Sequence, residues 1–152
     1  MHAPVRAHHR LGLIAGLVAA LALAPVALAA PAETTIVIDI EFGVSETFTA
    51  TGGVVCDSGT AVTDPVFFAG FGRKDRGVGT FHLVKTLTCA DGSGWFQLLV
   101  NAAGAPNSEG TIGGFSVAGG SEAYASLRGG GQIRGTGAET GIIDVYTGYL
   151  RD

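Results

Sequence analysis

The stretch Thr80–Ala102, TFHLVKTLTCADGSGWFQLLVNA, decides the fold that this sequence predicts. Apolar and polar side chains alternate through residues 80–89, and the same alternation returns through residues 95–102. Between them lies Ala90–Gly94, a run of Gly, Asp and Ser that is typical of a turn. Alternation with a period of two is the pattern of a half-buried strand. The stretch therefore predicts an antiparallel hairpin.

Further strands are expected on both sides of this hairpin. The sequence patterns predict them at 34–42, 44–50, 66–71, 111–117, 133–136 and 141–150. Gly129–Gly131 is expected to form a tight crossing, and Ile143, Val145 and Tyr149 share one phase of the last strand. About eight short strands with Gly-rich corners predict an all-β fold, an antiparallel barrel or sandwich.

The first 29 residues have the layout of a secretory signal peptide. A basic start with Arg6 and Arg10 precedes the apolar run 11–23, and Ala27–Ala29 has the small-x-small form that signal peptidase reads. The apolar run is shorter than the roughly 20 residues of a membrane-spanning helix, so we expect no stable membrane anchor. We expect removal of residues 1–29 and a single barrel domain over 30–152, in a secreted, extracytoplasmic protein.

The domain predicted over 30–152 is mildly acidic. It holds 7 Lys and Arg against 13 Asp and Glu, which gives a formal net charge of −6, compared with −4 for all 152 residues. Its one basic cluster, Arg73–Arg76, lies between glycines and is better interpreted as a solvated turn. Because neutralising phosphates requires clustered positive charge, we expect no nucleic acid partner.

Cys56 and Cys89 are the only cysteines of the chain. Two cysteines in an exported protein most often form a disulfide. This link would close a loop of about 34 residues and contribute roughly 3–4 kcal/mol in the chain-entropy model. A metal site would need further Cys or His ligands, and His82 is the only histidine after residue 29. We therefore expect a disulfide, no metal and no cofactor.

Three local patterns resemble catalytic or nucleotide-binding motifs. Asp57–Gly59 matches the Asp-Ser-Gly tripeptide of aspartic proteases, but a turn beside the disulfide explains so short a match more simply. A Ser-His-Asp triad would need His82, which lies in the Thr-rich phase of its strand and is expected to face outward. Gly135–Gly141 resembles a nucleotide-binding loop, but no helix follows it. We predict no catalytic residue.

Two charged residues interrupt faces that should point inward. Glu46 shares the phase of Phe48, and Lys85 shares the phase of Leu83 and Leu87. A charge inside a small barrel must be paired or solvated, since desolvating it alone costs several kcal/mol. Either both side chains lie at the barrel mouths and reach water, or they line a polar spot in a ligand cavity. We favour the mouths, because strand ends fray.

The stretch 115–136, FSVAGGSEAYASLRGGGQIRGT, resembles the allene oxide cyclase-like and dirigent-like barrels and looks like a small secreted bacterial member. Those families carry the motif G-G-[ST]-G-x-[YF]-x-G-x-x-G. This chain matches it at Gly119, Gly120, Ser121, Tyr124 and Gly129. It departs at Glu122 and Ser126, where the families prefer Gly. The resemblance implies an eight-stranded antiparallel barrel with a central cavity, often assembled into dimers or trimers.

Three classes of function follow from these observations. The leading hypothesis is a secreted barrel that binds a small apolar ligand, with Glu46, Lys85 and Tyr124 as candidate ligand-binding residues. The alternatives are an isomerase or cyclase acting on an apolar substrate inside the barrel, and an extracellular protein-interaction module. Polar groups with perturbed pKa values that converge in the cavity would favour an enzyme, whereas a dry lining would favour a binder.

Overall fold

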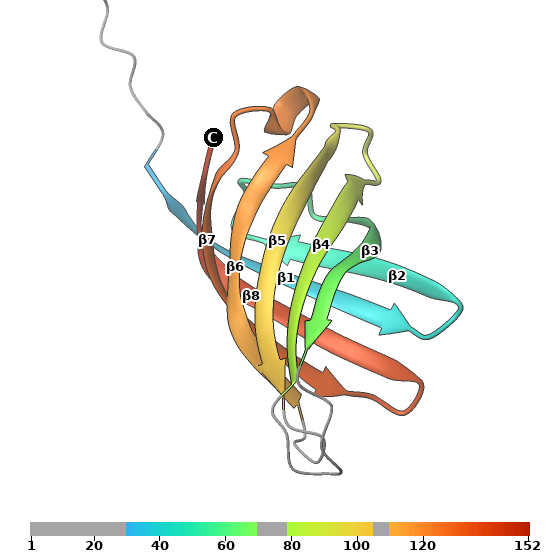
Figure 1. Ribbon diagram of the computed structural model, residues 1–152. Helices are drawn as coiled ribbons and strands as arrows, with labels where there is room; N and C mark the ends of the chain where they lie inside the picture. The colour runs from blue at the N-terminus through green and yellow to red at the C-terminus, as the bar shows by residue number, and fades with distance from the viewer. Residues whose placement is uncertain (1–29, 70–78, 105–109) are drawn as a thin grey trace, which may run out of the picture.

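Eight strands close into an antiparallel barrel, as the sequence predicts (Figure 1). The structure, a computed structural model, describes residues 30–69, 79–104 and 110–152, so the predicted signal peptide and the basic cluster Arg73–Arg76 lie outside the described residues. Each strand pairs with its neighbours in sequence, and β1 pairs with β8 to close the barrel. The strands are β1 (Ala32–Glu41), β2 (Ser45–Thr51), β3 (Ser58–Ala69), β4 (Gly79–Cys89), β5 (Trp95–Gly104), β6 (Gly110–Gly120), β7 (Arg128–Gly137) and β8 (Gly141–Arg151).

The third strand begins earlier than the sequence pattern indicates. A strand is predicted at 66–71, but β3 already begins at Ser58. Asp64 and Pro65 interrupt the alternation, and the register between β3 and β4 shifts between Pro65 and Phe67. Because proline cannot donate a ladder hydrogen bond, it is found within sheets mainly at edges and bulges of this kind. Residues 70 and 71 of the predicted strand lie outside the described residues.

The seventh strand corrects a second expectation. Gly129–Gly131 lies within β7, which begins at Arg128 and therefore starts earlier than the predicted 133–136. Consecutive glycines carry no alternation, so a pattern of side chains cannot reveal a strand there. A Cβ on Gly131 would collide with the carbonyl oxygen of Thr147 on β8, so only glycine fits this close approach of the two strands.

The up-and-down order gives the barrel two unlike ends. One end carries the connections 52–57, 90–94 and 121–127, and we call it the closed end. The open end carries the turns 42–44 and 138–140, together with the strand ends that flank residues 70–78 and 105–109. One short 3-10 helix, η1 (Glu122–Tyr124), lies at the closed end (Figure 1). No helix in the described part of the chain is long and apolar enough to cross a membrane.

Aromatic side chains fill the barrel toward the closed end. Phe96 is fully buried and makes edge-to-face contacts with Phe48 and Tyr124, at ring-centroid distances of 6.0 and 5.4 Å. Leu127, which follows η1, is also fully buried. The Tyr124 hydroxyl shares a 2.8 Å hydrogen bond with Ser93 Oγ in the β4–β5 turn. These contacts close the barrel with a solid core.

The corner around η1 places a non-glycine residue in the left-handed region. Glu122, one of the two departures from the glycine motif, has a φ of +52°. A side chain in this conformation costs about 1–2 kcal/mol, which explains why a glycine suits the position. Gly129, which matches the motif, has a φ of +136°.

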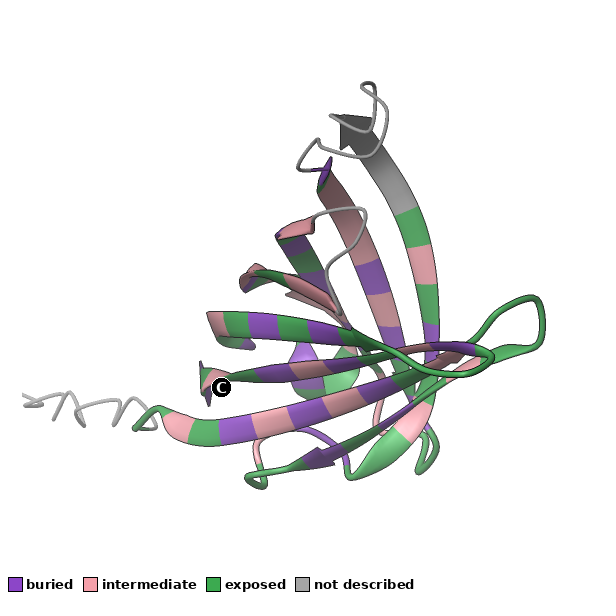
Figure 2. Cartoon of the chain, turned by 90° about the horizontal axis from the view of Figure 1, so that it is seen from below, coloured by how far each residue is buried: buried purple, intermediate pink, exposed green. Residues whose placement is uncertain are grey.

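Buried and exposed residues alternate along most strands (Figure 2). On β8 the face that points inward is opposite to the one marked by Ile143 and Tyr149, which are exposed. Tyr146 and Leu150 point inward and are fully buried. Both faces of β8 carry apolar side chains, so the alternation alone does not decide which face is buried.

A disulfide joins Cys56 and Cys89, as the sequence predicts. It links the β2–β3 connection to the last residue of β4, and both cysteines are buried. The bond therefore ties the closed end across a sequence separation of 33 residues. A structural disulfide is typical of proteins outside the reducing cytosol.

Candidate functional site

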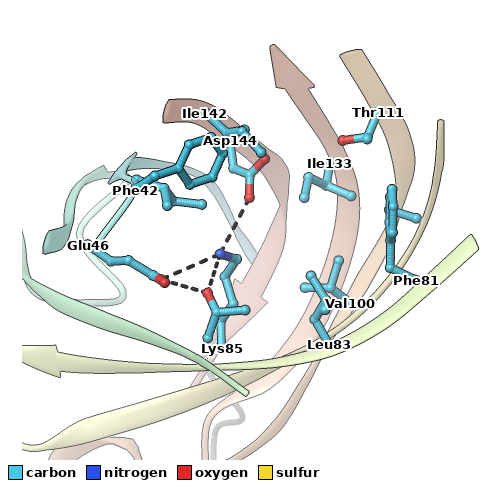
Figure 3. Close-up of a pocket in the computed structure, with 13 residues that line it drawn as sticks. Phe42, Glu46, Phe81, Leu83, Lys85, Val100, Thr111, Ile133, Ile142 and Asp144 are labelled. Atoms are coloured by element: carbon cyan, nitrogen blue, oxygen red, sulfur yellow. Dashed lines mark hydrogen bonds and ion pairs between the residues drawn. The ribbon is translucent and has the colours of Figure 1, made fainter. Parts of the chain in front are cut away.

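A cavity of about 450 Å³ occupies the open half of the barrel (Figure 3). Its wall is mainly apolar, with contributions from every strand. The lining residues are Ile40, Phe42, Glu46, Thr63, Phe81, Leu83, Lys85, Val100, Ala102, Thr111, Ile133, Ile142 and Asp144. The volume lies in the range of pockets that hold small molecules.

Along β5 the inward side chains become smaller toward the open end, which leaves room for the cavity. Along β5 the inward positions read Phe96, Leu98, Val100 and Ala102, and all four are buried. The first packs in the closed end, and the last two line the cavity. In an eight-stranded barrel the interior is just wide enough for side chains to fill it, so smaller side chains leave room for a ligand.

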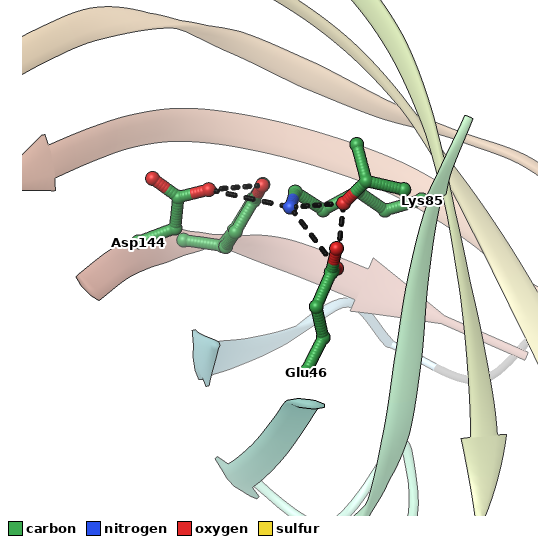
Figure 4. A network of polar contacts seen from close by, with 5 residues as sticks. Glu46, Lys85 and Asp144 are labelled. Carbon is green, nitrogen blue, oxygen red and sulfur yellow. Dashed lines mark hydrogen bonds and ion pairs between the residues drawn. The ribbon is translucent and has the colours of Figure 1, made fainter. Parts of the chain in front are cut away.

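A charged cluster lies against this apolar wall (Figure 4). The Lys85 side chain is 1% exposed, and its Nζ lies 3.5 Å from Asp144 Oδ2 and 3.7 Å from Glu46 Oε2. Asp144 is also nearly buried, whereas the Glu46 side chain is 23% exposed. The three residues come from β4, β8 and β2, so the cluster forms only when the barrel closes.

Two hydroxyl groups complete the cluster. Lys85 Nζ donates a 2.7 Å hydrogen bond to Thr63 Oγ1, and the Thr63 hydroxyl donates a 2.6 Å bond to Glu46 Oε2. On the other side, the Tyr146 hydroxyl donates to Asp144 Oδ2 at 3.3 Å. Among the described residues, no fully buried side-chain nitrogen or oxygen lacks a hydrogen-bond partner. The ammonium group thus makes one hydrogen bond, to Thr63, and two ion pairs, with Asp144 and Glu46.

Burial controls the ionisation of this cluster. Desolvation raises the pKa of Asp144 above its ordinary value of 3.8, and the nearby Lys85 ammonium opposes that rise. Desolvation also raises the pKa of Tyr146, and the charge of Asp144 adds to the increase. Tyr146 therefore remains a neutral hydrogen-bond donor, and the site holds a carboxyl group that takes up a proton more readily than an exposed aspartate.

A glycine leaves the space for the Asp144 carboxylate. Gly135 lies opposite Asp144 across the β7–β8 ladder and opposite Thr111 across the β6–β7 ladder. A Cβ on Gly135 would lie 2.5 Å from both Asp144 Oδ1 and Thr111 Oγ1. The missing side chain thus allows the carboxylate and the hydroxyl to face the cavity together.

The structure brings together two of the three candidate ligand-binding residues. Glu46 and Lys85 both line the cavity and share the charged cluster. The interpretation that both reach water at a barrel mouth does not describe Lys85, which is buried, although Glu46 is partly exposed. Tyr124 does not line this cavity, because it packs against Phe96 at the opposite, closed end.

Sequence reasoning did not identify Thr63 and Asp144, the two other residues that contact Lys85. Thr63 lies in the part of β3 that the pattern left out, and Asp144 lies on the β8 face that the apolar phase of Ile143 concealed. The sequence does contain one signal for Asp144, because this charged residue falls in the same alternating phase as the large side chains of Tyr146 and Leu150. A charge in an otherwise apolar phase is the same anomaly that marks Lys85.

The protease-like tripeptide and His82 lie away from the cavity. Asp57 is exposed beside the disulfide. His82 is half-buried, does not line the cavity and is hydrogen-bonded to Asn101. Within the ranges 30–69, 79–104 and 110–152, no three His, Cys, Asp or Glu side chains are grouped so that they could hold a metal ion. The chemistry of the site is therefore that of an amine, carboxyl groups and hydroxyls in an apolar chamber.

No protein-family model, curated protein or solved structure matches this chain.

Proposed function

We propose that the protein is a secreted barrel that binds a small, largely apolar ligand in the cavity at its open end. The observation that carries the proposal is an apolar chamber of about 450 Å³ with one polar cluster at its wall. Binding sites for small molecules combine a mainly apolar lining with a few well-placed polar groups in this way. The apolar wall supplies affinity, and the cluster fixes the orientation of the ligand.

Retention of the cavity supports binding over a purely structural role. A solid core would be more stable, because each unfilled part of a core forfeits packing contacts. The chain fills the closed end with Phe48, Phe96 and Tyr124, so its barrel accommodates large side chains where they occur. The open half keeps a cavity among Val100, Ala102 and the charged cluster, and Phe42 and Phe81 line this cavity without filling it.

A cavity-filling variant tests this function. In Ala102→Phe a phenyl ring occupies the chamber, and we expect the fluorescence enhancement of a neutral apolar probe, N-phenyl-1-naphthylamine, to fall at least tenfold. The matched control is Ala103→Phe, which makes the same change at the next residue, on the opposite face of β5. Equal probe binding by both variants and the unaltered protein would contradict the proposal.

Secretion and the resemblance to the allene oxide cyclase-like barrels belong to the same proposal. The disulfide, the signal-peptide pattern of residues 1–29 and the eight-stranded barrel support them together. Native mass spectrometry of protein taken from the medium of its own host tests both export and binding. We expect a mass that starts at Ala30, two fewer hydrogens for the disulfide, and a retained ligand.

A second candidate is an isomerase that acts on an apolar carbonyl compound in the same cavity. One observation favours it. The carboxyl group of Asp144, whose pKa is raised by burial, lies at the cavity wall beside Lys85, and polar groups of perturbed pKa are typical of active sites. Ionised Asp144 would take a proton from a carbon next to the carbonyl group and return it at another carbon, so atoms and charge balance without a further reactant.

Deuterium exchange separates the two candidates. An enzyme of this kind would introduce deuterium from D2O into unsaturated ketones, and Asp144→Asn would abolish the exchange. A binder would take up the same ketones without exchange. Mass spectrometry of the recovered ketones provides the measurement.

A further inference from the structure

The geometry points to a ligand whose polar head donates hydrogen bonds, an ammonium or hydroxyl group on an apolar body, and not to a carboxylate such as a fatty acid. This inference rests on the proposed binding function and specifies its ligand class. It follows from an inventory of donors and acceptors in the charged cluster formed by Glu46, Thr63, Lys85, Asp144 and Tyr146.

The donors of the charged cluster already face acceptors within it. The Lys85 ammonium group has three N–H donors and faces three acceptors, on Thr63, Glu46 and Asp144. The Thr63 hydroxyl donates to Glu46, and the Tyr146 hydroxyl donates to Asp144. An anionic ligand that enters the chamber would therefore compete with two carboxylates for the Lys85 ammonium group.

Acceptors of the charged cluster remain available. The interactions of both carboxylates use Asp144 Oδ2 and Glu46 Oε2, and no hydrogen bond from the described part of the chain reaches Asp144 Oδ1 or Glu46 Oε1. The Asp144 side chain is nine-tenths buried and lines the chamber, so its second oxygen is an unpartnered acceptor at the cavity wall. The Thr111 hydroxyl, near Asp144 across Gly135, accepts as well as donates.

The net charge of the cluster also favours a ligand head that is cationic or neutral. One ammonium and two carboxylates carry a net charge of −1 when all are ionised, inside a chamber whose other walls are apolar. A carboxylate head would place a third negative charge beside two others in a poorly solvated space, which opposes binding. An ammonium head would neutralise the site, and a hydroxyl would satisfy Asp144 Oδ1 without changing the charge.

The test uses three ligands with one tail and different heads: octylammonium, 1-octanol and octanoate. Isothermal titration calorimetry at pH 7.5 and 150 mM salt measures the three dissociation constants with the purified, disulfide-bonded protein. We expect octylammonium to bind at least tenfold more tightly than octanoate, with 1-octanol also ahead of octanoate. Ala102→Phe should weaken all three equally, because it fills the shared chamber.

Matched variants separate the charged cluster from the acidic surface. Asp144→Asn and Glu46→Gln should each reduce the preference for octylammonium over octanoate at least threefold. Asp39→Asn and Glu41→Gln remove the same charges from exposed positions on β1 and should leave the preference unchanged. Glu46 is partly exposed, so its variant keeps the test valid if Asp144→Asn fails to fold.

The outcomes distinguish the inference from the function on which it rests. If octanoate binds as tightly as octylammonium, or if the preference survives both cluster variants, the head-group inference is overturned while a binding cavity remains. If none of the three ligands binds in a manner sensitive to Ala102→Phe, the binding function and the inference both fail. Preference for octylammonium that is lost with Glu46 or Asp144 supports both.

Discussion

The two ends of this barrel use the same alternation of side chains for opposite purposes. At the closed end the inward positions carry Phe48 and Phe96, Tyr124 packs over them, and a disulfide joins the β2–β3 connection to β4. At the open end the inward positions of β5 carry the smaller Val100 and Ala102, the charged cluster around Lys85 lies at the wall, and a cavity of about 450 Å³ remains. This barrel thus concentrates its aromatic packing at one end and keeps a cavity at the other.

The charge arrangement follows the same division. Asp91 in the closed end's β4–β5 turn is exposed, and hydrogen bonds from Ser93 satisfy it locally. Asp144 is buried, and its Oδ2 is contacted by Lys85 on β4 and by the Tyr146 hydroxyl two residues along its own strand. A buried charge depends on its partners, whereas an exposed charge depends mainly on water.

The largest difference between the ends should appear on truncating a core side chain. Phe96→Ala removes a fully buried ring at the closed end and should lower the free energy of unfolding by about 3–5 kcal/mol. Leu83→Ala at the open end removes a half-buried side chain beside existing empty space and should cost about 1–2 kcal/mol. Urea denaturation measures both. Equal losses would mean that the open end is packed as tightly as the closed end.

The disulfide gives the next largest effect. Replacing both Cys56 and Cys89 with alanine should lower the free energy of unfolding by about 3–4 kcal/mol, because the unfolded chain regains the freedom of a long loop. Ligand binding at the distant cavity should persist wherever the variant remains folded, which calorimetry can measure. A loss of binding without unfolding would show that the two ends are coupled.

The charged cluster should be sensitive to the removal of one partner. Lys85→Met leaves two carboxylates without their cation and should cost about 3 kcal/mol at pH 7. Adding Asp144→Asn to Lys85→Met removes the unpaired buried charge and should recover much of that loss. Denaturation of the two single variants and the double variant measures the coupling. Strictly additive losses would contradict the assignment of a cooperative cluster.

The strained corner at the closed end offers a smaller gain. Glu122→Gly should raise the free energy of unfolding by about 0.5–1 kcal/mol, because glycine adopts the positive φ without the cost of a Cβ. Ala123→Gly is the matched control, since residue 123 does not have a positive φ and gains only unfolded-state freedom there. It should be destabilising. A melting temperature lowered by both changes would exclude strain at Glu122.

The smallest expected effects are on the pH dependence of stability, to which Asp144 at the open end and Asp91 at the closed end contribute with opposite signs. Burial raises the pKa of Asp144, so its contribution lowers stability as pH rises from 3.8, the ordinary value, through its folded pKa. Hydrogen bonds from Ser93 lower the pKa of Asp91, so its contribution is present above 3.8 and lost as pH falls through its folded pKa. Carboxyl carbon NMR should show Asp144 titrating above Asp91. The reverse order would contradict the burial of Asp144.

Particular residues show how far the sequence leads. The alternation through β4 and β5 predicted both strands and the inward position of Lys85, because one face of each strand is clearly apolar. Glycine and proline conceal strand residues, so the beginnings of β3 and β7 were missed. Asp144 was overlooked because both faces of β8 carry large apolar side chains. The local pattern fails where it contains no contrast between faces.

The strand alternation, the approximate number of strands and the cysteine pair could be predicted from the sequence, since they depend on neighbouring residues and on composition. The sequence also marked Glu46 and Lys85 as charges on inward faces. Only the tertiary structure decided that β2, β3, β4 and β8 bring their polar groups to one point, because β1 must pair with β8 before these strands surround one space. Closure also decided which end is filled. The volume of the cavity depends on how inward side chains from all eight strands fit together, so it cannot be predicted from any one local stretch of sequence.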